Sequence, residues 1–200
     1  MRLKLPRLSP RTRRRITDFD NAVEVQVARL RGNPVTDRVF YTASSLGEHG
    51  TIWLMLGALR GLRSEHDWKA AVRVGVGVGI ESAVVNLGVK SIFRRTRPVP
   101  TFAHPLPFRH PRTSSFPSGH ATSAFTAAAL LSEGDPLWPL YYAAATVVAT
   151  SRVYVKIHHA SDVVGGIAMG MVMGRIGRRL FPLAPPTAGM PESQGGLHRS

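Results

Sequence analysis

Apolar residues gather in five stretches of this chain, and each stretch is interrupted or short. The stretches cover residues 39–59, 70–93, 119–131, 137–155 and 163–180. A helix needs about 20 mostly apolar residues to cross a bilayer. Glu48 and His49 interrupt the first stretch, while the second contains Arg73, Glu81 and Asn86. The pattern fits a membrane bundle or a soluble helical bundle, and no strand-like alternation is long enough to build a sheet.

Small residues within these stretches favour the membrane. They are concentrated in GVGVGIESAVVNLG (75–88) and DVVGGIAMGMVMG (162–174). Helices that pack closely in lipid use such residues at their contacts, and polar residues in a membrane face the bundle interior. We therefore predict an all-α fold, a helical membrane bundle of about five transmembrane helices.

The two ends of the chain have different patterns. Ile16, Phe19, Val23, Val27 and Leu30 follow helical three and four spacing, with charged residues between them. This is typical of an amphipathic helix at a membrane interface, although a helix packed on a soluble core fits equally well. We expect a basic N-terminal tail over 1–15, an amphipathic interfacial helix over 16–34, a helical bundle over 35–181 and a disordered tail over 182–200.

Composition narrows the class of partner. The 200 residues suit one domain, and 26 Lys and Arg against 12 Asp and Glu give a formal charge of +14. Such a charge suits nucleic acid, an anionic membrane surface or a phosphorylated substrate. The chain has no cysteine, which excludes disulfides and thiolate chemistry. Seven basic residues in the first fifteen are followed by no apolar run, so we expect no secretory signal.

The stretch SSFPSGHATSAF (114–125) carries a histidine at the start of an expected helix. Ser118 can cap that helix, with Pro117 and Gly119 shaping its entry. The free N–H groups and the dipole of a helix start also attract phosphate, and His120 would then stand beside the bound anion. The motif alone does not decide between these roles.

Two further motifs lie at helix boundaries. In KSIFRRTRP (90–98), Pro98 helps to stop the second helix, and Lys90 and Arg97 lie two turns apart on nearly the same face. In SRVYVKIHHASD (151–162), Asp162 is four residues after His158 and can accept from its ring if the turn is helical. Considered one at a time, the basic residues are typical of side chains that extend from a helix to the membrane surface. Asp162 is likewise typical of a residue that caps the start of a helix.

The expected topology brings the motifs together. If the five helices cross in alternation, the second and fourth helices end where the third and fifth begin. The polar residues of all three motifs would then surround one pocket: Lys90, Arg97, Ser118, His120, Arg152, His158 and Asp162. Cations and N–H groups would hold a phosphate there, with two histidines to transfer it.

These three motifs resemble those of the type 2 phosphatidic acid phosphatase superfamily. The family pattern is Lys, six residues, Arg-Pro; then Pro-Ser-Gly-His; then Ser-Arg, five residues, His, three residues, Asp. The chain matches it without a gap, from Lys90 to Asp162. The resemblance implies an integral-membrane lipid phosphatase with no metal and no other cofactor, whose partners are a lipid phosphate substrate and membrane lipids, with no nucleic acid.

The resemblance also implies a role for each matched residue. His158 would form a phosphohistidine, Asp162 would fix its tautomer, and His120 would be the general acid and then the base. Five groups would hold the phosphate oxygens: Lys90, Arg97, Arg152, Ser118 and the backbone N–H of Gly119. The residues around the nucleophile differ from the usual family sequence, because this chain has Lys-Ile-His-His-Ala at 156–160. His159 is therefore a second imidazole next to His158.

Two further features of the sequence bear on the substrate and on the side of the membrane that the active site faces. The five-span layout and the Gly-Glu-His-Gly at 47–50 are similar to actinobacterial members of the family. They suggest a polyprenyl-linked cell-envelope precursor such as decaprenylphosphoryl phosphoribose. Undecaprenyl diphosphate, phosphatidylglycerophosphate, phosphatidic acid and a catalytically inactive lipid-binding protein are the alternatives. The site side would hold 18 Lys and Arg and the other side 8, which favours a cytoplasmic active site.

Overall fold

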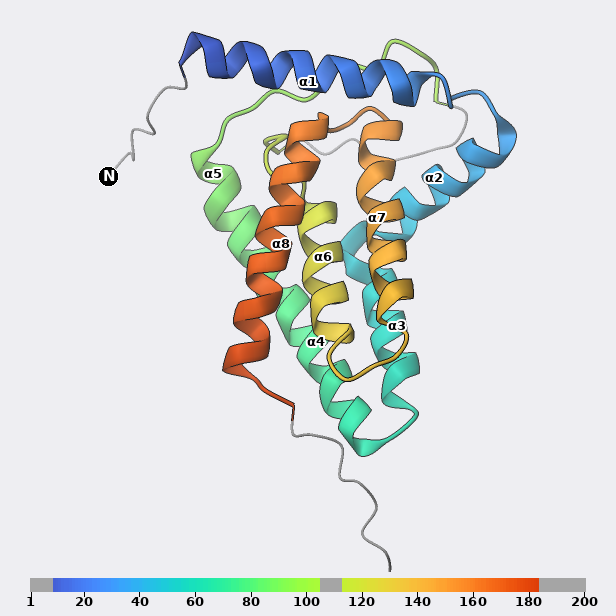
Figure 1. Cartoon of the computed structure of the whole chain (residues 1–200), viewed down its shortest axis with the longest axis vertical. Coiled ribbons are helices and arrows are strands. Elements are labelled where there is room, and N and C mark those ends of the chain that lie inside the picture. Colours follow the sequence, from blue (N-terminus) through green and yellow to red (C-terminus); the bar gives the residue numbers. More distant parts are fainter. Residues whose placement is uncertain (1–8, 105–112, 184–200) are drawn as a thin grey trace, which may run out of the picture.

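The computed structural model describes residues 9–104 and 113–183, which form helices and connecting loops without a strand (Figure 1). This agrees with the predicted all-α fold. In chain order the elements are α1 (Pro10–Ala28), α2 (Pro34–Leu46), η1 (Glu48–Gly50), α3 (Thr51–Gly61), α4 (Glu65–Ala83), η2 (Val84–Val89), α5 (Lys90–Ile92), α6 (Gly119–Leu131), α7 (Trp138–Tyr154) and α8 (Ala160–Leu180).

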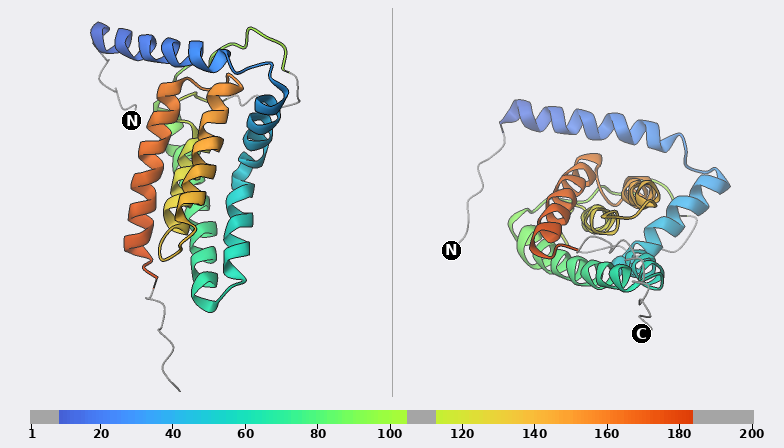
Figure 2. Two further views of the ribbon diagram at one scale, coloured as in Figure 1. Left: turned by 45° about the vertical axis from the view of Figure 1, so that its right-hand side comes forward. Right: turned by 60° about the horizontal axis from the view of Figure 1, so that its bottom comes forward.

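Helix α6 is the centre of the bundle. In the end-on view of Figure 2 it lies inside a ring formed by α3, α4, α7 and α8. Ten of its 13 residues are buried, and all ten are Ala, Ser, Thr or Leu. A helix with apolar and small residues on every side has no face suited to water, and burial all round is its stable arrangement.

Close packing between α6 and α8 explains the run of small residues in α8. A methyl group on Gly166 would stand 2.6 Å from the carbonyl oxygen of Ser118, and one on Gly170 would stand 2.5 Å from that of Thr122. The obstacle is the α6 backbone in both cases, so a larger residue would have to separate the two helices. Their contact places the start of α8 beside the start of α6.

The number of membrane crossings stays a prediction. By length and composition, one helix among the described residues could span a membrane, the 28-residue segment from Glu65 to Ile92. The expected stretch at 39–59 is broken at η1, where His49 and Gly50 have φ values of 54° and 73°. Helix α6 has 13 residues, which extend only about 20 Å.

Helix α1 lies across the end of the bundle where α7 ends and α8 begins (Figures 1 and 2). It starts at Pro10, because the Ser9 side chain accepts from the N–H of Thr12 and proline suits the first helical position. Residues 10–15, which we expected in the basic tail, are therefore helical. Most of the expected C-terminal tail, residues 184–200, lies outside the described residues.

Candidate active site

A cavity of about 940 Å³ lies between the turn at η1, the α4–η2–α5 segment and the start of α6. It contains five of the seven polar residues that the expected topology brings together. Six of the eight predicted site residues line it: Lys90, Arg97, Gly119, His120, Arg152 and His158. The other two, Ser118 and Asp162, are buried behind its wall.

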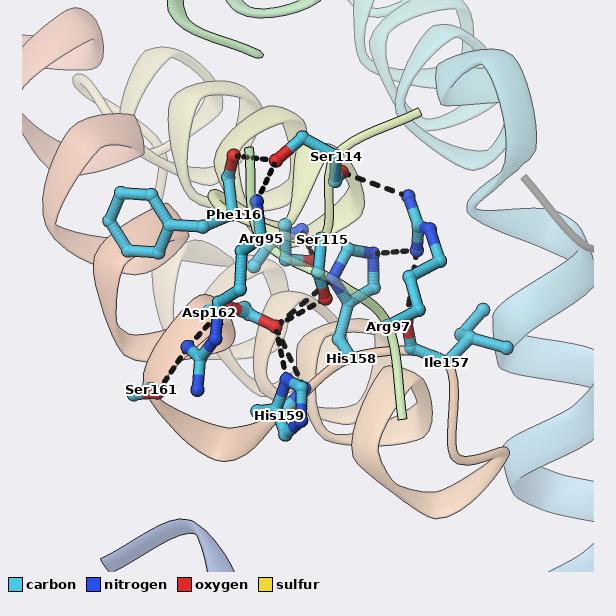
Figure 3. A network of polar contacts seen from close by, with 12 residues as sticks. Arg95, Arg97, Ser114, Ser115, Phe116, Ile157, His158, His159, Ser161 and Asp162 are labelled. Atoms are coloured by element: carbon cyan, nitrogen blue, oxygen red, sulfur yellow. Dashed lines mark hydrogen bonds and ion pairs between the residues drawn. The ribbon is translucent and has the colours of Figure 1, made fainter. Parts of the chain in front are cut away.

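His158 is held between a guanidinium and a carboxylate (Figure 3). Its Nε2 lies 3.0 Å from a terminal nitrogen of Arg97, whose other contacts include the carbonyl oxygens of Thr113, Ser114 and Ile157. A guanidinium can only donate, so Nε2 is the acceptor and the proton of the neutral ring belongs on Nδ1. This is the tautomer that an Nε2 nucleophile requires.

Burial also keeps the His158 ring neutral. The side chain is 3% exposed, and this burial lowers the pKa of the imidazole to about 4. Asp162 opposes the shift, while the charges of Arg97 and Arg152 add to it. At neutral pH Nε2 is therefore unprotonated, as attack on phosphorus requires.

Asp162 contacts more partners than the sequence indicated. Its Oδ2 lies 3.8 Å from Nδ1 of His158, too far for a hydrogen bond. Shorter contacts come from the Ser115 hydroxyl at 2.6 Å, Arg95 at 2.6 Å and the backbone N–H of His159 at 2.9 Å. The His159 ring nitrogen lies 3.2 Å away as well. The predicted His158–Asp162 pair is thus an electrostatic contact within a larger network (Figure 3).

Arg95 extends this network to α1. One terminal nitrogen donates to Asp162 and to the Ser161 hydroxyl, and the other donates to Asp20 at 2.6 Å. Asp20 also accepts from the backbone N–H and hydroxyl of Ser161 at 2.8 and 2.9 Å. Sequence reasoning missed both residues. The sequence does contain one sign of the role of Asp20, because this carboxylate lies in line with Ile16 and Val23 on the apolar face of its helix.

The start of α6 presents His120 to the cavity. The buried Ser118 hydroxyl accepts from the N–H of Ala121 at 3.4 Å, as an N-cap does, and the Ser118 N–H donates to the Asp162 carbonyl. A methyl group on Gly119 would stand 3.4 Å from Nζ of Lys90. Nε2 of His120 has no hydrogen-bond partner among the described residues, so it is free to bind a ligand.

Lys90 and Arg97 come from different elements, which corrects the expectation that one helix carries both. The helix ends at Ile92, because Phe93 is extended (ψ 122°) and packs on Phe116 with ring centroids 4.9 Å apart. Arg97 therefore reaches the site from the following loop. Lys90 Nζ donates to the Asn86 side chain at 3.0 Å.

Arg152 is the third cation of the cavity, and it is almost fully buried. One terminal nitrogen donates to the Ser44 hydroxyl, while its Nε has no partner within the part of the chain that the structure describes. Three cations and two imidazoles thus share one cavity. Such a set can hold the oxygens of a phosphoryl group and transfer it to and from a nitrogen.

Sequence comparison relates this chain to known proteins. The family model described as PAP2 superfamily matches residues 70–184. The decaprenylphosphoryl-5-phosphoribose phosphatase of Mycobacterium tuberculosis is 36% identical over 139 residues, which cover 66% of this chain and 73% of that protein. Its counterpart from Mycolicibacterium smegmatis is 32% identical over 151 residues, 74% and 81% of the two chains.

The fold also matches a solved membrane enzyme. The crystal structure of the transmembrane PAP2 type phosphatidylglycerolphosphate phosphatase from Bacillus subtilis superposes with a TM-score of 0.63 at 23% identity. The match covers 82% of this chain and 85% of that one. At this identity the likeness concerns the arrangement of the helices.

Proposed function

Because the chain belongs to the PAP2 superfamily, we propose that it is an integral-membrane phosphatase that hydrolyses a lipid-linked phosphate through a phosphohistidine. The observation that carries the proposal is the cavity that His120 and His158 share with three cations. No metal has a part in the proposed reaction, because the cations supply the charge that the phosphoryl oxygens need.

The mechanism follows from the position of each group. His120 enters the reaction protonated. Nε2 of His158 attacks phosphorus, the bond to the leaving oxygen breaks, and His120 gives that oxygen its proton. Water then attacks the phosphohistidine while His120 takes a proton from it, which releases phosphate and restores both rings. The cations and the Gly119 N–H hold the phosphoryl oxygens throughout. Asp162 stabilises the charge that develops on His158, and Ser118 shapes the turn that presents Gly119.

The proposed substrate is a polyprenyl-linked cell-envelope precursor of the decaprenylphosphoryl phosphoribose type. The names of the Mycobacterium and Mycolicibacterium relatives support this choice. The alternative substrates are undecaprenyl diphosphate, phosphatidylglycerophosphate and phosphatidic acid. The motif residues do not distinguish among these lipids, because they bind the phosphate that all of them carry. A catalytically inactive lipid-binding protein is disfavoured by the complete set of catalytic positions.

We place the protein in the cell membrane as a multi-pass protein of about five spans, with α1 at the interface and the active site facing the cytoplasm. The excess of Lys and Arg at the site end, 18 against 8, supports this orientation.

Phosphate release by the purified protein tests the proposal. The substrates are decaprenylphosphoryl 5-phosphoribose, undecaprenyl diphosphate and phosphatidic acid, each with wild type and with His158→Ala. We expect wild type to release phosphate with EDTA present and His158→Ala to lose at least about 1,000-fold in rate. Failure of wild type on all three, equal rates in the variant or a strict magnesium requirement would contradict the proposal.

A further inference from the structure

The cavity is much larger than the phosphate that its cations would hold. At about 30 Å³ for each water-sized group, the five heavy atoms of a phosphate fill only about a sixth of the 940 Å³. Beyond the cations the wall continues with polar side chains that the reaction does not use: Glu48, Glu81, Ser82, Asn86 and Ser123. This part of the cavity has room for the group that carries the phosphate.

Glu81 is the most informative of these side chains. It lines the cavity, is only 1% exposed, and its Oε1 has no hydrogen-bond partner among the described residues. An unsatisfied buried acceptor costs stability, so its retention requires another benefit. Its unpaired oxygen can accept a hydrogen bond, so a ligand that supplies a donor would satisfy it.

The helix is deformed in a way that brings Glu81 to the cavity. Residues 81 and 90 are nine positions apart, about two and a half turns of a regular α-helix, and would lie on opposite faces. Between them η2 is a π-helix, whose wider turns reduce this offset. Lys90 and Glu81 consequently line the same cavity. The side chains of Ser82, Asn86 and Lys90 are joined by hydrogen bonds of 3.1 and 3.0 Å along this wall.

The neighbours of Glu81 restrict what its ligand can be. An ammonium group would be repelled by the three cations in the same cavity. A metal ion would need more ligands, and no group of three His, Asp or Glu side chains that could hold one occurs within residues 9–104 and 113–183. Hydroxyl groups remain, because they carry no charge and can both donate to and accept from a glutamate side chain.

We propose that Glu81 binds hydroxyl groups of the substrate's alcohol, so that the enzyme selects the phosphate ester of a polyhydroxylated alcohol, such as a pentose, over that of diacylglycerol. This inference rests on the proposed function and adds a specificity-determining residue to it. Glu81 acts on the leaving group, while the cations and histidines act on the phosphate. Its loss therefore affects discrimination between substrates.

The test compares kcat/KM for decaprenylphosphoryl 5-phosphoribose with that for phosphatidic acid, which has no free hydroxyl. We expect Glu81→Leu to reduce this ratio at least tenfold, mainly through KM, and Glu81→Gln to reduce it less, because its amide oxygen still accepts. Glu65→Gln is the matched control, an exposed glutamate at the other end of α4. An unchanged ratio in Glu81→Leu, or an equal fall in Glu65→Gln, would overturn the proposal.

A measurement on wild type alone keeps the proposal testable if the variants fold poorly. Ribose 5-phosphate and ethyl phosphate are compared as inhibitors of phosphatidic acid hydrolysis. We expect ribose 5-phosphate to inhibit at least tenfold more strongly, and equal inhibition would overturn the role of Glu81. If wild type hydrolyses neither lipid, the proposed phosphatase function has itself failed.

Discussion

The two ring nitrogens of His158 face different groups, and this asymmetry determines how the ring can react. Nε2 lies 3.0 Å from Arg97 at the cavity, while Nδ1 lies 3.8 Å from Asp162 and makes no hydrogen bond to any residue that the structure describes. Attack on phosphorus by Nε2 makes the ring positive. The carboxylate on the Nδ1 side can then approach and stabilise that charge.

The burial of His158 predicts an unusual titration. Its folded pKa of about 4 lies below the ordinary value of 6.5, so the unfolded state takes up a proton first as pH falls. This group's contribution to stability should therefore fall between about pH 6.5 and 4 and remain level below. NMR of ¹⁵N-histidine-labelled protein, with His158→Asn for assignment, should show the ring neutral at pH 5.5. A midpoint at or above pH 6 would contradict the burial argument.

The three motifs predicted which side chains come together at one cavity. Six of the eight predicted site residues line it. Arg95 and Ser115 were missed because they act on Asp162 from 67 and 47 positions away. Asp20 was missed for the same reason, since its bonds to Ser161 span 141 positions.

At the scale of elements, α1 is connected to the site through one carboxylate. Arg95 donates hydrogen bonds to both Asp20 and Asp162. The position of α1 therefore affects the position of the Asp162 carboxylate, which lies beside His158. We expect Asp20→Asn to lower kcat about tenfold with a smaller change in KM, because the charged hydrogen bond that orients Arg95 is weakened. Steady-state kinetics on a lipid phosphate measures this.

The matched control is Asp18→Asn, which alters an exposed carboxylate of the same helix. It should leave both constants unchanged. Equal effects of the two substitutions, or a loss in KM alone, would show that Asp20 does not position Asp162.

The contact between α6 and α8 predicts a stability effect. A methyl group on Gly170 would lie 2.5 Å from the Thr122 carbonyl oxygen, so Gly170→Ala must push two helices apart. We expect a loss of about 1–3 kcal/mol, which lowers Tm by roughly 2–12 °C in a chain of this size. Gly79→Ala is the control, since nothing lies within 4 Å of its added methyl group. Equal Tm values for the two variants would contradict this packing.

Helix bounds were predictable where local signals set them. The expected third stretch, 119–131, coincides with α6, because Ser118 caps its start. The first stretch, which Glu48 and His49 interrupt in the sequence, breaks at the left-handed His49 and Gly50. The helix expected to reach Pro98 ends at Ile92, where Phe93 packs on Phe116. Such tertiary contacts have no local signature in the sequence.

At the scale of the whole molecule, the two ends of the bundle should lie on opposite sides of the membrane. The chain has no cysteine, so Asn21→Cys in α1 and Leu62→Cys after α3 each provide a single label site. With the active site in the cytoplasm, an impermeant thiol reagent applied to intact cells should label Leu62→Cys and spare Asn21→Cys until lysis. The opposite pattern would reverse the orientation, and labelling of both would contradict the span count.

The central claim is that this cavity transfers a phosphoryl group to His158. Rapid acid-free quenching of a reaction with ³²P-labelled decaprenylphosphoryl 5-phosphoribose, labelled at the 5-phosphate, measures it directly. We predict an alkali-stable, acid-labile label on wild type and on His159→Ala, whose backbone N–H still reaches Asp162, and none on His158→Ala. Label that survives in His158→Ala, or that is lost in His159→Ala alone, would contradict the account.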